Sequence, residues 1–309
     1  MCDVAISQLT SPRLDLDQEL ALATAAGLDA ISLWRPKVSD AGLGAVATLL
    51  ACARVRVSSL QWVGGFTAGD GRSFDESLAD AVEAIEAARL LAASVVVVHT
   101  GCRGGHTRAH AARLVRDALR TLAPVAHDAG VTLAVRPIHS AVAPGGSLLT
   151  GLAAACDFVD GIDHPAVGLA IDLWQFADAL DLAELLPRLA TRAAIVQVAD
   201  RIGPPSPHAD RLPAGHGTLP LGRLLAGLCR QGYKGDFEFD PVGEVVESLG
   251  HAAVVREMAA TAAVWLGDRA ARPEAVGWPA PPRILQRRSA VAGAGSLRSH
   301  ASSHTVSRG

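Results

Sequence analysis

The stretch VGLAID, residues 167–172, alternates small or polar residues with large apolar ones. Successive side chains of a strand point to opposite faces, so the two kinds of residue separate. One face carries Gly168, Ala170 and Asp172, and the other carries Val167, Leu169 and Ile171. An open parallel sheet has helices on both faces, and its strands form nearly continuous apolar runs. The alternation instead favours a closed barrel with large apolar side chains outside, and DFEFD (236–240) repeats it.

Strand-like runs alternate with longer, Ala- and Leu-rich helical runs along most of the chain. The expected strands cover 4–9, 30–34, 55–62, 94–99, 131–136, 167–172, 194–200 and 236–240. The expected helices cover 16–27, 40–53, 74–92, 107–129, 148–160, 181–191, 219–231 and 243–267. Eight such units predict a (β/α)8 TIM barrel, an α/β fold, as a single domain over residues 1–268. A doubly wound open sheet is the alternative.

The composition changes after residue 268. Seven arginines and one acidic residue, Glu274, give 269–309 a formal charge of +6, which leaves −9 on the preceding part of a chain whose total is −3. The segment is rich in Arg, Pro, Gly and Ser and has no helical period, which predicts a disordered tail. Contact with an anionic partner and a functionless extension are the two interpretations of this tail.

Bulk properties exclude several classes of function. The negative body and a pI near 6.4 give no general attraction for nucleic acid or an acidic membrane surface. The apolar runs are shorter than the ~20 residues of a membrane span, and no signal peptide is apparent. Five widely spaced cysteines without a CxxC pair indicate neither a disulfide framework nor a zinc knuckle. We therefore expect a cytoplasmic protein that binds neither nucleic acid nor membrane.

Polar residues occupy the ends of four successive expected strands. Arg136, Asp172, Gln197 and Asp240 fall at the carboxyl ends of strands five to eight, and Glu238 precedes Asp240 by two on the same face. That end of a TIM barrel carries the active site. Clustered buried ionisable groups cost free energy unless something compensates them, which favours a functional site. A polar layer that only closes the barrel end is the alternative.

Several motifs carry a family resemblance. They are SLQWVGGF, VVVHTGCRGGH, LAVRPIHS, VGLAIDLWQ, IVQVADRIG, PAGHGTLPLGRLLAGL and GYKGDFEFDPVG. In this order and spacing, over roughly residues 3–266, the chain resembles the sugar phosphate isomerases and epimerases of the xylose isomerase-like TIM barrel superfamily. Relatives in that superfamily include hydroxypyruvate isomerases, ketose 3-epimerases, inosose dehydratases and endonucleases acting at abasic sites.

The resemblance implies a divalent metal held by Glu, Asp, His and Glu from strands five to eight. Asp172 matches the Asp, Gln197 replaces the His, and Asp240 replaces the last Glu. Arg136 stands in place of the first Glu. An arginine side chain has hydrogen-bond donors but no lone pair to ligate a metal. Its positive charge also repels a cation, with a repulsion energy of ~4 kcal/mol per unit of cation charge at a separation of ~4 Å and an effective dielectric of ~20. We expect Asp172, Gln197 and Asp240 to bind Mg²⁺ or Mn²⁺ weakly or not at all.

Two roles for Arg136 follow. It takes over the electrostatic duty of the metal, bonding to Asp172 and Asp240 while facing a carbonyl, enediolate or carboxylate oxygen of the substrate. Alternatively it neutralises the carboxylates of a lost metal site in a binding or vestigial protein.

Further residues near the same rim are candidates for contact with a substrate. Aromatic rings supply an apolar wall, and imidazole, amide and guanidinium groups bind oxygens. The loop 202–218 is long for a βα connection and is a candidate lid. The candidate substrate-binding residues are Trp34, Trp62, His99, Arg103, His139, Gln175 and Arg201.

The leading hypothesis is a sugar phosphate isomerase or epimerase of carbohydrate metabolism that transfers a proton next to a carbonyl. Arg136, Asp172, Glu238 and Asp240 are its expected catalytic residues, with Glu238 or Asp240 as the base. A dehydratase or lyase on the same scaffold and a non-catalytic sugar-binding barrel are the alternatives, and DNA repair is more distant. The expected partner is a small sugar or hydroxy-carbonyl compound, and a homodimer is possible.

Overall fold

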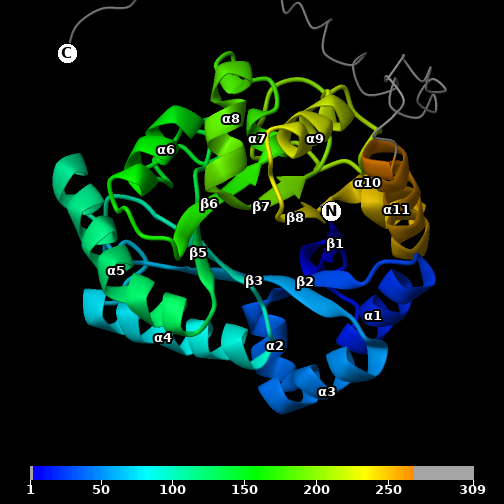
Figure 1. Cartoon of the computed structure of the whole chain (residues 1–309), viewed down its shortest axis with the longest axis horizontal. Coiled ribbons are helices and arrows are strands. Elements are labelled where there is room, and N and C mark those ends of the chain that lie inside the picture. Colours follow the sequence, from blue (N-terminus) through cyan, green and yellow to red (C-terminus); the bar gives the residue numbers. More distant parts are fainter. Residues whose placement is uncertain (1–2, 268–309) are drawn as a thin grey trace, which may run out of the picture. The chain divides into compact units, whose positions relative to one another are not determined.

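A computed structural model describes residues 3–267 as a closed barrel of eight parallel strands, in the order β1 to β8 (Figure 1). Every neighbouring pair is parallel, and β8 pairs with β1 to close the ring. The strands are β1 (Val4–Ser7), β2 (Ala30–Trp34), β3 (Arg56–Gly64), β4 (Val95–His99), β5 (Thr132–Arg136), β6 (Val167–Asp172), β7 (Ala193–Val198) and β8 (Asp236–Phe239). The predicted TIM barrel is confirmed, and the doubly wound alternative is wrong.

The helices surround the barrel, as Figure 1 shows. They are α1 (Leu16–Ala25), α2 (Arg35–Ala41), α3 (Leu43–Ala53), α4 (Phe74–Leu90), α5 (Arg108–Asp128), α6 (Leu152–Asp160), α7 (Leu173–Phe176), α8 (Leu182–Arg192), α9 (Leu221–Arg230), α10 (Glu244–Leu249) and α11 (His251–Gly267), with a short 3₁₀ turn, η1 (Gln8–Thr10). Within residues 3–267, none of these helices is both long and apolar enough to cross a membrane.

Two expected helices are each divided by a glycine. The helix predicted over 40–53 is replaced by α2 and α3, which meet at Gly42, and Gly250 separates α10 from α11. These glycines have φ of 82° and 81°, in the left-handed region that an α-helix cannot continue through. The expected strand 4–9 also ends early, because η1 begins at Gln8.

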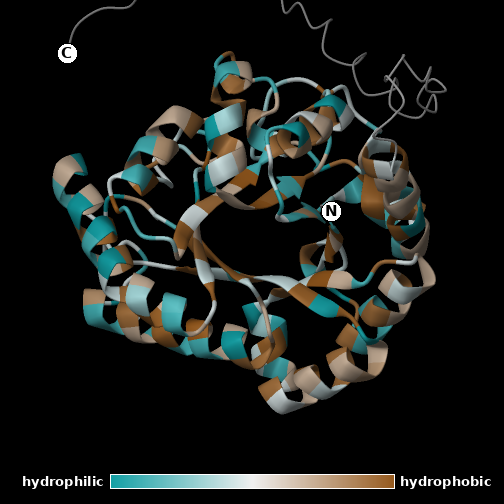
Figure 2. Cartoon of the chain, in the orientation of Figure 1, coloured by the Kyte–Doolittle hydropathy of each residue, from teal (hydrophilic) through white to brown (hydrophobic). Residues whose placement is uncertain are grey.

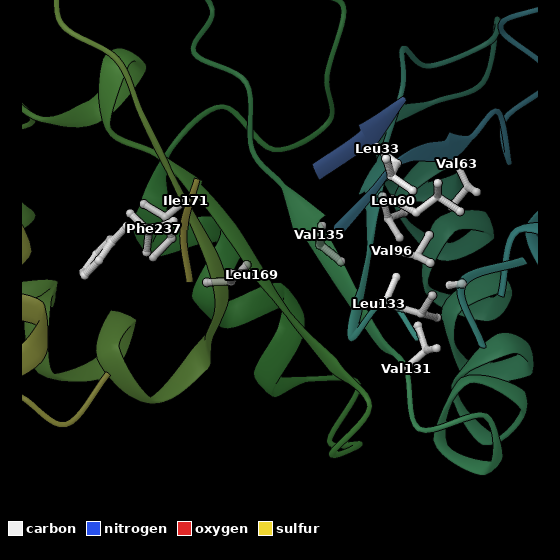
Figure 3. Close-up of a cluster of buried hydrophobic side chains, with 14 of the residues drawn as sticks. Leu33, Leu60, Val63, Val96, Val131, Leu133, Val135, Leu169, Ile171 and Phe237 are labelled. Atoms are coloured by element: carbon white, nitrogen blue, oxygen red, sulfur yellow. The ribbon is translucent and has the colours of Figure 1, made fainter. Parts of the chain in front are cut away.

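The main core lies between the strands and the helices. Leu33, Leu60, Leu169 and Phe237 point outward from the barrel and are almost completely buried under the helices (Figure 3). The helices present their hydrophilic residues mainly outward (Figure 2). The alternation of VGLAID is therefore confirmed, because Leu169 and Ile171 belong to this outer core while Ala170 belongs to a second, inner one.

The inner cluster fills part of the barrel interior. It consists of Val95, Val97, Ala134, Ala170 and Ile195, all buried. Three of these are branched apolar residues, whereas the alternation of VGLAID indicated small or polar residues on the inward face. Further along the same strands the inward positions become polar. The barrel interior is thus packed and apolar at one level and polar at its carboxyl end.

The boundaries of the predicted barrel domain, residues 1–268, stay a prediction. The expected disordered tail, 269–309, lies outside the described residues.

Candidate active site

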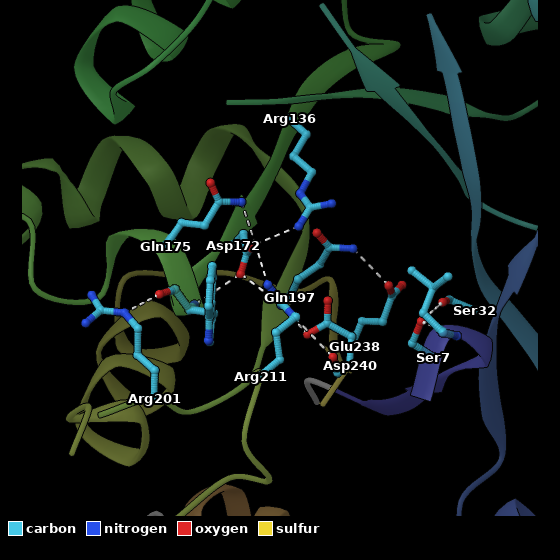
Figure 4. A network of polar contacts seen from close by, with 12 residues as sticks. Ser7, Ser32, Arg136, Asp172, Gln175, Gln197, Arg201, Arg211, Glu238 and Asp240 are labelled. Atoms are coloured by element: carbon cyan, nitrogen blue, oxygen red, sulfur yellow. Dashed lines mark hydrogen bonds and ion pairs between the residues drawn. The ribbon is translucent and has the colours of Figure 1, made fainter. Parts of the chain in front are cut away.

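Strand register brings the predicted polar residues together at the carboxyl end of the barrel. His99 pairs with Arg136 between β4 and β5, Asp172 pairs with Gln197 between β6 and β7, and Gln197 pairs with Glu238 between β7 and β8. Asp240 follows two residues after Glu238, and its N–H donates to the carbonyl of Val198. Figure 4 shows the resulting polar network.

Asp172 is the centre of this network. It is fully buried, and Arg136 Nη2 donates to its Oδ2 at 2.6 Å. Arg211 donates to both of its oxygens, at 2.9 and 3.0 Å, and Gln175 Nε2 adds a bond of 2.7 Å. Burial acts to raise the pKa of Asp172, but the charges of Arg211 and Arg136 outweigh it and hold this pKa far below its usual range. Asp172 is therefore ionised near neutral pH and holds two guanidinium groups.

Asp240 has a different electrostatic environment. Its Oδ1 accepts from Arg211 Nη2, and its backbone carbonyl accepts from Arg211 Nε at 3.1 Å. Burial raises the pKa of Asp240 to about 7, with the nearby charge of Asp172 acting in the same direction and Arg211 opposing both. Many active sites contain two neighbouring carboxyl groups with different pKa values, because one group can then act as an acid while the other stays ionised.

Arg211 was not anticipated from the sequence. It lies in the predicted lid loop 202–218, and its backbone exchanges two hydrogen bonds with Val242, at 3.0 and 2.8 Å. Leu212 next to it exchanges two more with Asp200, both at 2.8 Å. The guanidinium carbon lies 5.1 Å from the ring centroid of Trp174, in cation–π range. The expected bond between Arg136 and Asp240 is replaced, because Arg211 is the arginine bonded to Asp240.

Glu238 is buried deeper along the same face of β8. Its carboxylate accepts from Ser59 Oγ at 2.6 Å, Gln61 Nε2 at 2.6 Å and Gln197 Nε2 at 3.1 Å. Burial raises the pKa of Glu238, and these hydrogen bonds act against the increase. The same carboxylate thus joins β8 to β3 and β7 inside the barrel.

Four buried polar atoms near the mouth have no hydrogen-bond partner. They belong to the inward positions of β3, β4, β5 and β7 and are Gln61 Oε1, His99 Nε2, Arg136 Nε and Gln197 Oε1. Burial and the charge of Arg136 lower the pKa of His99 to about 3, so its imidazole is neutral near pH 7. Unpaired buried polar atoms cost free energy, and a ligand rich in hydroxyl groups would supply both donors and acceptors for them.

A cavity of about 460 Å³ lies over this network, within the size range of ligand sites. Arg136, Gln175 and Arg211 contribute its polar wall. The remaining lining residues come from the loops after β5, β7 and β8 and from α7, and are Ile138, Val142, Ala143, Trp174, Ser206, Pro207, His208, Ala209, Asp210, Val242 and Gly243.

The predicted aromatic residues lie beside a different cavity. Trp34 and Trp62 line a space of about 520 Å³ against α2, β3 and α4, which shares no lining residue with the first cavity. Trp62 is 39 % exposed and stacks on His99 with ring centroids 4.9 Å apart. Trp62 therefore reaches the polar network through His99, whereas Trp34, at the end of β2, pairs in register with Gln61.

The side chains of three other predicted substrate residues do not contact the acids. Arg201 is almost completely buried and donates to Asp178 and to the carbonyls of Trp174 and Gly203, so it holds the loop rather than facing the cavity (Figure 4). The ring of His139 accepts from the N–H of Ala141, a local contact. Arg103 is exposed in the loop after β4. These placements favour structural roles for Arg201 and His139.

Gln175 is the predicted substrate residue that the structure places next to the acids. It is buried and lines the first cavity, and besides donating to Asp172 it accepts from the backbone N–H of His139 at 2.7 Å. It thereby links the loop after β5 to the acid on β6.

The donor set does not fit a divalent metal in this arrangement. Both oxygens of Asp172 and one of Asp240 accept from arginines, and a guanidinium cannot ligate a cation. Among residues 3–267, no group of three or more His, Cys, Asp or Glu side chains is placed to hold an ion. The expected weak site of Asp172, Gln197 and Asp240 is incompatible with these arginine contacts.

Solved structures with the same fold support this architecture. The protein SMc04130 from Sinorhizobium meliloti 1021 is 24 % identical, with a TM-score of 0.76 over 84 % of this chain and 96 % of its own. An IolI protein with a binding zinc atom is 18 % identical, with a TM-score of 0.74 over 86 % and 98 %. D-psicose 3-epimerase with D-tagatose, from Clostridium cellulolyticum H10, is 13 % identical, with a TM-score of 0.69 over 85 % and 98 %. At these identities the likeness shows the fold alone.

No curated protein matches the chain. The sequence profile of the xylose isomerase-like TIM barrel family, however, matches residues 20–253, which is most of the described barrel. The chain therefore belongs to the xylose isomerase-like TIM barrel family.

Proposed function

We propose that this protein is an isomerase or epimerase that moves a proton next to the carbonyl group of a small, polyhydroxylated substrate. The observation that carries the proposal is the pair of buried carboxyl groups, Asp172 and Asp240, which Arg211 joins at the barrel mouth. One stays anionic, and the other has a pKa of about 7. A catalytic base is most effective when its pKa lies near the working pH.

Asp240 is the proposed base. It accepts the proton from the carbon next to the carbonyl, and the electrons of the broken C–H bond pass to the carbonyl oxygen to form an enediolate. Return of the proton to the neighbouring carbon, with transfer of the hydroxyl proton, completes an isomerisation. Return to the opposite face of the same carbon, from a second acid such as Glu238, completes an epimerisation.

Arg136 is the proposed electrophile. Its Nη2 is held by Asp172, while its Nε has no partner and is buried at the mouth. A fixed guanidinium stabilises the negative charge that develops on the carbonyl oxygen, and loss of one such donor lowers turnover by about 10²–10³-fold. Asp172 positions this group and Arg211 and takes no proton itself.

The proposed substrate class is a small sugar or other hydroxy-carbonyl compound. The unpaired atoms of Gln61, His99 and Gln197 support it, because vicinal hydroxyl groups both donate and accept hydrogen bonds. The similar fold of an epimerase crystallised with D-tagatose is consistent with this class. The stacked rings of Trp62 and His99 offer an apolar surface to the C–H face of such a compound.

Solvent deuterium exchange tests the proposal. Purified protein in D₂O is mixed with ketoses, hydroxypyruvate and inosose, and incorporation is followed by NMR. We expect exchange into at least one compound and a loss of about 10²–10⁴-fold in Asp240→Asn. Asp157→Asn removes an exposed carboxylate that pairs with Arg188 on the outer surface, and it should retain the wild-type rate.

A sugar-binding protein without turnover is the second candidate. It is favoured by the arginine contacts of both Asp172 and Asp240, which neutralise the carboxylates even without a substrate. Folded wild-type protein that binds a panel member yet exchanges no deuterium into any of them would establish this candidate in place of the enzyme. Loss of water from the exchanging compound would instead assign a dehydratase.

A further inference from the structure

The segment around Arg211 is fixed between the ends of two strands. Arg211 pairs through its backbone with Val242, in the chain leaving β8, and Leu212 pairs with Asp200, in the chain leaving β7. The indole N–H of Trp174 also donates to the carbonyl of Asp210 at 3.1 Å. The loop therefore holds Arg211 in place through its main chain on both sides.

The guanidinium of Arg211 bridges the two acids. Nη1 and Nη2 donate to the two oxygens of Asp172, Nη2 also donates to Oδ1 of Asp240, and Nε donates to the Asp240 carbonyl. Four of its five N–H donors are thus used on two residues. Its side chain is only 13 % exposed, so little solvent screens these contacts.

We propose that Arg211 is an internal cation that occupies the place of a divalent metal between Asp172 and Asp240. Arg136 places a second positive charge beside Asp172, which makes the position between the two acids still less favourable for a metal ion. The inference concerns the charge at the mouth rather than the reaction, and it holds whether or not the protein turns a substrate over.

Removing the internal cation should uncover a metal site. Without Arg211, three carboxylate oxygens lose a donor, namely both of Asp172 and Oδ1 of Asp240. Gln197 lies next to Asp172 in the strand register and has an unpaired amide oxygen. Carboxylate and amide oxygens suit Mn²⁺ and Mg²⁺.

Manganese binding measured by EPR and titration calorimetry tests the inference. Wild type should bind no Mn²⁺ at this site at 1 mM, whereas Arg211→Met should bind one equivalent at least about 100-fold more tightly, because one opposing charge is gone. Arg211→Lys, which keeps the charge, should stay close to wild type. Arg223→Met removes an exposed arginine on α9 and should also leave manganese binding unchanged.

A double variant covers the case in which Arg211→Met alone folds poorly. Arg136→Met combined with Arg211→Met leaves both acids without arginine partners, and Mn²⁺ should raise its melting temperature while leaving that of wild type unchanged. Tight binding of one Mn²⁺ by wild type would overturn the inference, as would folded variants that bind no more Mn²⁺ than wild type. Deuterium exchange by wild type in EDTA separately tests the proposed reaction, so failure of one experiment is distinguishable from failure of the other.

Discussion

Asp172→Asn should strongly destabilise the barrel, because it leaves two largely buried arginines with too little negative charge. In the wild type, Asp172 is fully buried and accepts from Arg136, Arg211, Gln175 and the backbone N–H of Trp174. The asparagine keeps one acceptor oxygen and turns an amide donor toward the guanidinium groups. Breaking a buried ion pair from one side costs roughly 3–5 kcal/mol.

Asp157→Asn is the matched control for this substitution. Asp157 also pairs with an arginine, Arg188, at 2.7 Å, but its side chain is 73 % exposed. An exposed pair of this kind contributes about 0–1 kcal/mol. Urea unfolding at pH 7 measures both variants against wild type, and thermal unfolding should show Asp172→Asn melting roughly 6–20 °C lower, at about 2–4 °C per kcal/mol.

The pH dependence adds a second check. The folded pKa of Asp172 is depressed, so its contribution to stability is present above the unfolded value near 3.8 and is lost as the pH falls below it. The difference between wild type and Asp172→Asn should therefore shrink in acid. Equal unfolding free energies for the Asp172 and Asp157 variants at pH 7 would refute the reasoning.

Deuterium exchange should rise with pH and level off above about 7, because the ionised form of Asp240 is the proposed base. A rate that is flat from pH 5 to 9 would contradict this assignment. The raised pKa of Asp240 also means that its contribution to folding stability is full below about pH 4 and lost as the pH rises through 7, which urea titrations of wild type and Asp240→Asn should resolve. The His99 ring should keep its neutral NMR shifts from pH 8 down to pH 5, since burial lowers its pKa to about 3. Gly104→Ala should lower the unfolding free energy by more than about 2 kcal/mol, because the added Cβ would lie 1.8 Å from the Thr67 carbonyl oxygen. Gly105→Ala is the control, since a Cβ there meets no atom within 4 Å. It should lower the unfolding free energy by about 1–2 kcal/mol, the cost of a left-handed alanine, in the same assay.

The barrel was predictable because its signal repeats. Successive residues of a strand point to opposite faces, and the alternation in β6 and β8 shows which face is the interior. The ends of β5, β6 and β8 could therefore be located closely enough to identify Arg136, Asp172 and Glu238 as inward residues. Asp240, just beyond β8, follows from the same register.

Loop residues were not predictable in the same way. Arg211 lies in a segment without any period, so the sequence indicates a long loop but not which side chain turns toward the acids. Arg201 illustrates the opposite error, because it follows the end of β7 yet its guanidinium bonds to Asp178 and to backbone carbonyls. Whether an arginine beside a strand end faces the mouth or anchors a loop depends on partners distant in sequence.

Glu238 has a consequence for the width of the barrel. Its carboxylate bonds to Ser59 and Gln61 of β3, although β1 and β2 lie between β8 and β3 in the ring. These hydrogen bonds cross the barrel interior and restrain β8 and β3 from moving apart. The length of the Glu238 side chain thus limits the width of the barrel interior between β8 and β3. We expect Glu238→Asp to widen the interior at this point.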